Sequence, residues 1–206
     1  MSFGCPKRVD VIMKIAYLFA CSLLVIAAPG VAQPNTIKAT TENLKAALID
    51  LQKYPGSAQA QQKYLKAFPR DYKTFLELFD LEGRELYDGH EYILILPSLA
   101  KNHLHEVGSI LVELSKDAEY QADAPGYLQD VTADYARSYT RSFVRLIKPL
   151  TQKQRTKLIV FLADEEAIAK DPRYQNIIDK LRKLGELELA MQFESKRSDR
   201  ARLGDH

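Results

Sequence analysis

Apolar residues recur every three or four positions over most of this chain, which is the spacing that places them on one face of a helix. The first such segment begins at Asn35 and ends at the turn 54–57, where a proline and a glycine are adjacent. A second segment, from Ala58 to Phe68, stops at Pro69, and a third follows Asp71, a residue type that caps helix N-termini. We predict a helix for each of the three.

The segment from Leu86 to Leu99 is ambiguous between a helix and a strand. Residues 92–96 read Tyr-Ile-Leu-Ile-Leu, which suits a buried strand, and Pro97 is unfavourable inside a helix. A single strand would leave its backbone groups unpaired, however, and no second apolar run suggests a partner strand. We therefore expect a helix here.

The second half of the chain has the same helical spacing. Helices are predicted over Leu104–Ala118, over Gly126 to about Lys148, from a capping box at 151–154, and from Asp171-Pro172 onward. The whole pattern predicts a single compact all-α domain of about seven or eight helices over residues 33–194. An irregular stack of helical hairpins is the alternative architecture, although no internal repeat supports it. The charged residues 195–206 are expected to form a disordered tail.

The first 32 residues have the three-part layout of a secretory signal peptide. Three cations precede an apolar run over residues 15–28, which is shorter than the roughly 20 apolar residues that a membrane span needs. Small residues before Gln33 fit a cleavage site, so we expect export to the periplasm or out of the cell. Retention of the leader and lipidation at Cys21 are the alternatives, and Met13 is a second candidate start.

Charge and cysteine content exclude several functional classes. The chain has 29 basic and 27 acidic residues, a net charge of +2, unlike a polybasic nucleic-acid-binding protein or an acidic disordered tail. Cleavage after residue 32 would leave 26 residues of each sign and would remove both cysteines. A mature chain of this kind has no disulfide and no thiol chemistry.

Acidic and basic residues are segregated in the middle of the chain. Residues 102–134 contain seven acids and one cation, whereas residues 135–163 contain seven cations and no acid. On one continuous helix, four of these cations share a face, which we call the basic ridge: Arg137, Arg141, Arg145 and Lys148. Pairing with the helix dipole and with neighbouring acids is the simple explanation, but it leaves Arg141 and Arg145 without acids in their own helix. The basic ridge is therefore the candidate binding site.

Catalytic and metal-binding patterns are weak in this sequence. None of the four histidines lies three or four residues from another, so the helical two-histidine zinc signature does not occur. His103 and Glu106, three residues apart, form a weak candidate metal or acid–base pair. Neither a glycine-rich phosphate loop nor a Gly-x-Ser-x-Gly elbow is present. We assign no catalytic residue, no metal and no cofactor.

Residues 66–79, Lys-Ala-Phe-Pro-Arg-Asp-Tyr-Lys-Thr-Phe-Leu-Glu-Leu-Phe, are followed closely by Glu-Leu-Tyr-Asp at 85–88. This stretch resembles a pattern in small secreted all-helical bacterial proteins, with Phe79-Asp80 where those proteins tend to carry Tyr-Gly. The resemblance implies export and a helical fold, and it carries no activity. Taken by themselves, the aromatic residues on either side of Pro69 predict a packed hinge between two short helices.

These patterns together favour an exported, non-enzymatic helical protein that binds another macromolecule, in an adaptor, inhibitor or immunity-type role. The expected partner is a protein or another anionic macromolecule of the cell envelope, and nucleic acid is not expected. An envelope hydrolase with carboxylate or histidine acid–base chemistry is one alternative. A peripheral membrane protein held on anionic lipid by the basic ridge is the other.

Overall fold

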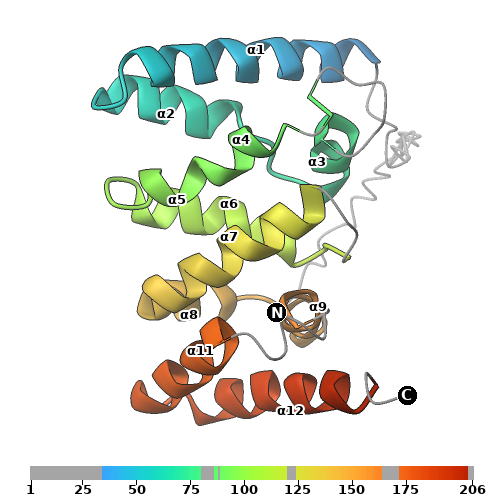
Figure 1. Cartoon of the computed structure of the whole chain (residues 1–206). Coiled ribbons are helices and arrows are strands. Elements are labelled where there is room, and N and C mark those ends of the chain that lie inside the picture. The colour runs from blue at the N-terminus through green and yellow to red at the C-terminus, as the bar shows by residue number, and fades with distance from the viewer. Residues whose placement is uncertain (1–33, 80–85, 88, 120–123, 164–171, 204–206) are drawn as a thin grey trace, which may run out of the picture. The chain divides into compact units, whose positions relative to one another are not determined.

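The computed structural model describes residues 34–79, 86–87, 89–119, 124–163 and 172–203, which form helices joined by short turns (Figure 1). In chain order the helices are α1 (Pro34–Lys53), α2 (Ala58–Ala67), α3 (Tyr72–Phe79), α4 (His90–Leu94), α5 (Leu96–Leu99), α6 (Leu104–Ser115), α7 (Ala124–Ser138), α8 (Thr140–Ile147), α9 (Gln152–Leu162), α11 (Pro172–Lys183) and α12 (Leu187–Leu203). Three predictions concern residues outside these ranges: the leader at 1–32, the N-cap at Asp171 and the end of the tail at 204–206.

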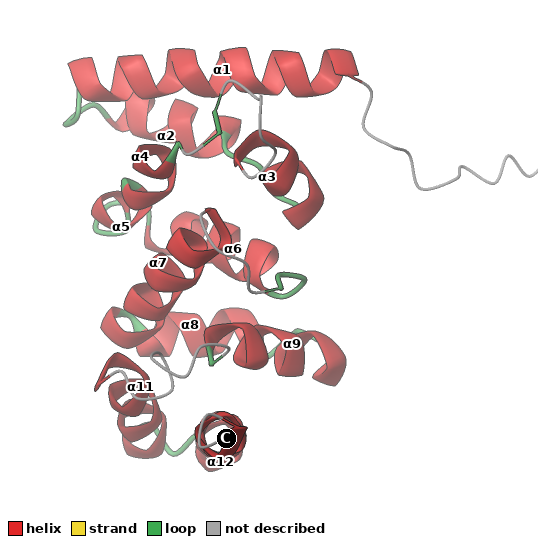
Figure 2. Cartoon of the chain, turned by 45° about the vertical axis from the view of Figure 1, so that its right-hand side comes forward, coloured by secondary structure: helices red, strands yellow, loops and turns green. Residues whose placement is uncertain are grey.

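The all-α class predicted from the sequence is confirmed. No strand occurs in the described ranges, as Figure 2 shows by colour, and the ambiguous segment 92–96 runs from α4 through a turn at Ile95 into α5. None of the described helices is both long enough and apolar enough to cross a bilayer.

The described ranges contain more helices than the seven or eight expected, because several predicted helices are divided. The helix expected from Gly126 to Lys148 is two helices, which meet at Tyr139 (φ −125°, ψ 44°). The Thr140 hydroxyl donates to Ala136 O at 2.8 Å at this break, and such bonds compete with the regular helix ladder. The last predicted helix is divided at Gly185, whose φ of 77° is the left-handed conformation common after a helix C-terminus. After that turn α12 continues to Leu203, past the domain boundary expected at residue 194.

Local helix signals in the sequence are confirmed. The Asp71 carboxylate accepts a hydrogen bond from Thr74 N at 2.8 Å and so caps α3. Phe68, in extended conformation before Pro69, ends α2. Both bonds of the capping box at 151–154 are present at the start of α9.

Most of the main helix contacts join neighbours in the chain, whereas α7 and α11 meet across a longer separation. α1 and α2 form a hairpin, α6 packs on α7 and α8, and α11 packs on α7 and α12 (Figures 1 and 2). One hydrophobic cluster takes buried residues from every helix named above. The predicted aromatic hinge is part of it, with Phe79 5.9 Å from Phe68 and 5.2 Å from Phe75 between ring centroids.

Three buried tyrosines each hydrogen-bond to a backbone carbonyl of another helix. Tyr64 donates to Tyr92 O at 2.5 Å, Tyr135 to Leu104 O at 2.9 Å, and Tyr174 to Phe193 O at 3.0 Å. Burial raises the pKa of all three hydroxyls, because the interior disfavours a phenolate. These bonds fix α2 to α4, α6 to α7, and α11 to α12.

Candidate functional site

The four residues of the basic ridge lie on two helices rather than on one. Arg137 is on α7, before the break at Tyr139, whereas Arg141 and Arg145 are on α8 and Lys148 is its C-cap residue. Phe143, Val144 and Ile147 of α8 are buried, so the opposite face of this helix carries its cations toward solvent. The one-helix geometry expected for the ridge is therefore wrong, although Arg141 and Arg145 share α8 and Lys148 follows at its end.

Two members of the ridge have acidic partners. Arg137 Nη2 is 3.3 Å from Asp134 Oδ1, the contact that the dipole-and-neighbour explanation requires. Lys148 Nζ is 2.7 Å from Glu186 Oε1, which comes from the turn between α11 and α12. Pairs as exposed as these contribute about 0–1 kcal/mol to stability, but they do compensate the two charges locally.

The other two members of the basic ridge have no acidic partner among the described residues. Arg141 and Arg145 are exposed, and neither is ion-paired or hydrogen-bonded to any part of the chain that the structure describes. Two exposed lysines of α9, Lys153 and Lys157, share this property over the same ranges. The lack of an acidic partner therefore does not by itself mark a site, and a second feature has to distinguish α8 from α9.

That feature is a cleft of about 380 Å³ beside the first turn of α8, which we call the basic cleft. Its lining comes from the α7–α8 junction and from the end of α11, and consists of Ser138, Thr140, Arg141, Lys180, Lys183 and Leu184. Three of these six residues are cations and none is acidic. Arg141 is thus one side of a cationic cleft to which α7, α8 and α11 contribute.

One of the three cations of the basic cleft is held in place, and no acid lines the cleft. Lys180 Nζ donates to Arg137 O at 2.6 Å, which fixes the ammonium group at the α7–α8 junction. Acids on the surrounding helices are engaged elsewhere: Asp134 contacts Arg137 and Arg173, and Asp179 accepts from Gln175 at 2.8 Å. The lining therefore gathers positive charge in one shallow, open cleft.

The two residues of the second candidate site from the sequence, His103 and Glu106, lie beside one another. His103 Nδ1 is 3.9 Å from Glu106 Oε2, and His103 Nε2 is 3.1 Å from Gln61 Oε1. Arg70 reaches the other oxygen of Glu106 at 3.4 Å. Over the described residues, no group of three His, Cys, Asp or Glu side chains is placed to hold a metal ion. These contacts tie α2 and its following loop to the start of α6.

The remaining histidines do not join either cluster. His105 is exposed, and the His90 ring lies 5.3 Å from that of Tyr127. His206 lies outside the described residues.

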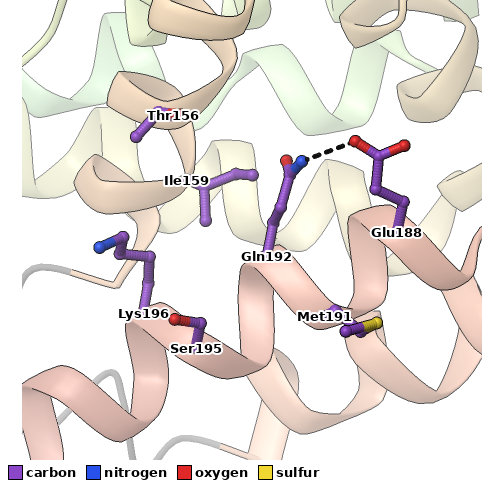
Figure 3. Close-up of a pocket in the computed structure, with 7 residues that line it drawn as sticks. All are labelled: Thr156, Ile159, Glu188, Met191, Gln192, Ser195 and Lys196. Carbon is purple, nitrogen blue, oxygen red and sulfur yellow. Dashed lines mark hydrogen bonds between the residues drawn. The ribbon is translucent and has the colours of Figure 1, made fainter.

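Another pocket, of about 300 Å³, lies between α9 and α12 (Figure 3). Ile159 extends from α9 toward α12 in this view, and Gln192 donates to Glu188 at 3.1 Å. The atoms that face this pocket are mainly carbon, and its lining residues include one acid and one cation, Glu188 and Lys196. It contains neither a histidine nor a pair of acids, so acid–base chemistry finds no support there.

The sequence identified Arg141 but not the two lysines that share its cleft. Lys180 and Lys183 belong to the basic last turn of α11, a pattern that the helix dipole explains on its own. Nothing in their spacing shows that α11 returns to the start of α8.

Comparisons with protein-family models, curated proteins and solved structures found no match to this chain. The residues above are therefore the basis for any functional conclusion.

Proposed function

We propose that this protein is a non-enzymatic binding module, and that it binds an anionic macromolecule through the basic cleft and the adjoining face of α8. The observation that carries the proposal is the convergence of Arg141, Lys180 and Lys183 from two helices around one cleft with no acidic lining. Like charges that line one cleft repel one another, so the arrangement costs free energy unless an anion binds there. An anionic partner supplies that charge.

The shape of the surface also suits a macromolecule. Arg145 lies one helical turn beyond Arg141 on the exposed face of α8, so positive charge continues outside the cleft. Arginine is over-represented in interfaces because its guanidinium forms paired hydrogen bonds with carboxylate and phosphate groups. Complementary charge of this kind raises association rates and selects partners more than it adds affinity.

Export, as the leader predicts, would place this surface in the cell envelope or outside the cell. There we expect it to meet anionic macromolecules of the envelope, in an adaptor, inhibitor or immunity-type role. The hydrolase alternative has weaker support, because the described contacts of the His103 and Glu106 side chains are to one another, to Gln61 and to Arg70, and neither residue lines a described pocket.

The proposal is tested by recovering the tagged protein from the envelope fraction of its own host at low and at high salt. The test variant is Arg141→Glu/Arg145→Glu on α8. The matched control is Lys153→Glu/Lys157→Glu on α9, which makes the same change in net charge at two exposed cations that also lack described partners. Circular dichroism of each variant checks that the helices are intact.

We expect wild type and the α9 control to retain one stoichiometric partner, and the α8 variant to lose it by at least tenfold. High salt should release the partner, because ions screen exposed charges over about 10 Å at 0.1 M. Equal recovery with all three proteins, or equal loss in both variants, would refute binding through this surface.

A further inference from the structure

The basic cleft has more positive charge and more hydrogen-bond donors than a single carboxylate can satisfy. A ligand with more charge and more acceptor oxygens fits it better. We infer that the cleft binds a terminal phosphate group, carried as a phosphate monoester by the anionic partner. This inference rests on the proposed function and names the chemical group by which that partner is anchored.

The first argument is charge. The lining holds Arg141, Lys180 and Lys183, and no acid among its residues offsets them. A carboxylate carries one negative charge and two oxygens, and a bidentate contact with Arg141 alone would satisfy both. Two ammonium groups would then remain uncompensated in the same cleft. A phosphate monoester carries a charge of about −1.5 to −2 and three terminal oxygens, which matches the three cationic groups better.

The second argument is the number of hydrogen-bond donors that remain available to a ligand. Lys180 gives one proton to Arg137 O and keeps two for a ligand. The Thr140 hydroxyl is engaged with Ala136 O, so it offers its oxygen but no proton. Ser138 is exposed at the junction, has no described partner and retains a hydroxyl donor. Ammonium, guanidinium and hydroxyl donors thus face one cleft, and an acceptor-rich group satisfies them together.

The third argument is preorganisation. The Lys180 ammonium is already held at 2.6 Å from a backbone carbonyl, so little side-chain freedom is lost when a ligand contacts it. Arg141 is placed by α8, whose buried residues Phe143, Val144 and Ile147 fix the helix on its neighbours. A cleft of about 380 Å³ accommodates a phosphate group with part of the moiety that carries it, which leaves the ester side open to solvent.

The test is a titration of the purified full chain, followed by backbone amide NMR, with four probes at matched ionic strength. The probes are methyl phosphate, inorganic phosphate, dimethyl phosphate and acetate. We expect methyl phosphate to shift the amide signals of residues 138–141 and 180–184 and to bind at least tenfold more tightly than acetate or dimethyl phosphate. Binding of methyl phosphate should weaken several-fold from about pH 7.5 to about pH 5, because the second pKa of the phosphate group is near 6 and the monoanion carries less charge.

Variants assign the effect to the cleft. Lys183→Gln and Arg141→Gln should each weaken methyl phosphate binding by about five- to tenfold, as expected when one charged hydrogen-bond donor is lost. Lys157→Gln on α9 is the matched control and should leave the affinity unchanged. Both cleft residues are exposed, so the variants are expected to fold, and their amide spectra report this directly.

The outcomes separate this inference from the proposed function. If acetate binds as tightly as methyl phosphate, or if Lys183→Gln changes neither, the phosphate inference fails, even where partner recovery still depends on Arg141 and Arg145. If inorganic phosphate binds at least tenfold more tightly than its methyl ester, the ligand is the free ion and the anchoring role fails. If methyl phosphate binds but the partner is recovered equally with the α8 variant and with wild type, the proposed macromolecular function fails instead.

Discussion

The starts of α6 and α8 have nearly the same backbone geometry and opposite surroundings. His103 precedes α6 at φ −128° and ψ 46°, and Tyr139 precedes α8 at φ −125° and ψ 44°; neither side chain caps its helix. At the start of α6, the polar side chains are hydrogen-bonded to other parts of the protein. At the start of α8, three cations from two helices converge without an acid in the cleft lining.

The start of α6 is closed by contacts from two sides. Gln61 of α2 lies against His103, while Tyr135 of α7 donates its hydroxyl proton to Leu104 O. The Tyr135 hydroxyl is also 2.9 Å from Ser142 Oγ, and since its one proton goes to the carbonyl, Ser142 donates in that pair. Gly108, one turn further along α6, lies against the hydroxyl end of the Tyr135 side chain. This region uses its polar groups to hold helices together.

Whether a polar residue near a helix start is a functional candidate therefore depends on which side chains of other helices surround it. His103 and Arg141 both stand out in the sequence as polar residues near a helix start. Tertiary packing gives His103 hydrogen-bonding partners and gives Arg141 two further cations. We expect perturbations of the α6 start to change stability, and perturbations of the α8 start to change binding with little effect on stability.

Alkaline pH is the perturbation with the largest expected effect, and it acts through Tyr135 and the two other buried tyrosines. Burial raises the pKa of Tyr64, Tyr135 and Tyr174 above the unfolded value of about 10. Their contribution to stability is therefore complete below about pH 10 and is lost as the pH rises toward the folded-state values. Each pH unit in that window costs about 1.4 kcal/mol per tyrosine, so three together lead to cooperative unfolding.

The measurement is urea unfolding, followed by circular dichroism, at a series of pH values from about 8 to 12. Tyr135→Phe should lower stability at neutral pH and make its decline above pH 10 shallower, because one titrating group is gone. A free energy of unfolding that is constant across this range would contradict the burial of the tyrosine hydroxyls.

Gly108→Ala should have the next largest effect. A Cβ atom at this position would overlap the Tyr135 hydroxyl of α7 and lie 2.6 Å from Leu146 Cδ1 of α8, so both side chains would have to shift or α6 would have to move away from them. We expect a loss of about 1–3 kcal/mol in the free energy of unfolding. Gly56→Ala is the control, since the added methyl group would have no neighbouring atom within 4 Å, and it should change stability by less than about 0.5 kcal/mol. Equal effects of the two substitutions would refute the close approach of α6 and α7.

Gln61→Ala should cost about 1–2 kcal/mol, because it removes the centre of the network at the α6 start. Gln61 is buried, donates to Pro55 O at 2.7 Å and accepts from Asn102 at 3.2 Å in addition to its contact with His103. Gln192→Ala removes a single bond to exposed Glu188 and should cost less than about 0.5 kcal/mol. Chemical denaturation of both variants measures the difference, and a neutral Gln61→Ala would mean that the network does not hold α2 to α6.

Much of the helical structure could be predicted from the sequence because its signals are local. Asp71 caps α3 and Pro69 ends the preceding segment through groups within a few residues of each helix terminus. Gly185 gives a similar local signal, because a glycine follows a leucine at the end of an apolar stripe. The charged, helix-favouring residues after it made one long helix the simpler prediction. The break at Tyr139 has neither proline nor glycine, and the contacts of Tyr135 and Thr140 accompany it.

The candidate site was predictable only in part, for the same reason. The exposure of Arg141 and Arg145 follows from the apolar spacing of α8, and the Arg137–Asp134 pair follows from their separation by three residues. The partner of Lys148 and the two lysines of the basic cleft come from the far end of α11 and the turn after it. Because no local pattern links those segments, only the tertiary structure could place them beside α8.

The smallest effect on stability is expected at the basic cleft itself. Lys183→Gln and Arg141→Gln remove exposed charges that have no described acidic partner, so each should change the free energy of unfolding by less than about 0.5 kcal/mol. The double variant should be slightly more stable than wild type at low salt, because it relieves repulsion within the cleft, and this gain should vanish at high salt.

Arg173→Gln is the contrasting variant, because Arg173 contacts Asp130 at 2.8 Å and Asp134 at 3.7 Å. It should lose up to about 1 kcal/mol at low salt. Urea unfolding of wild type, the cleft variants and Arg173→Gln at two salt concentrations therefore separates a charge that stabilises the fold from charges that do not. If the cleft variants were destabilised as much as Arg173→Gln, the cleft cations would be structural, and the contrast between the α6 and α8 starts would fail.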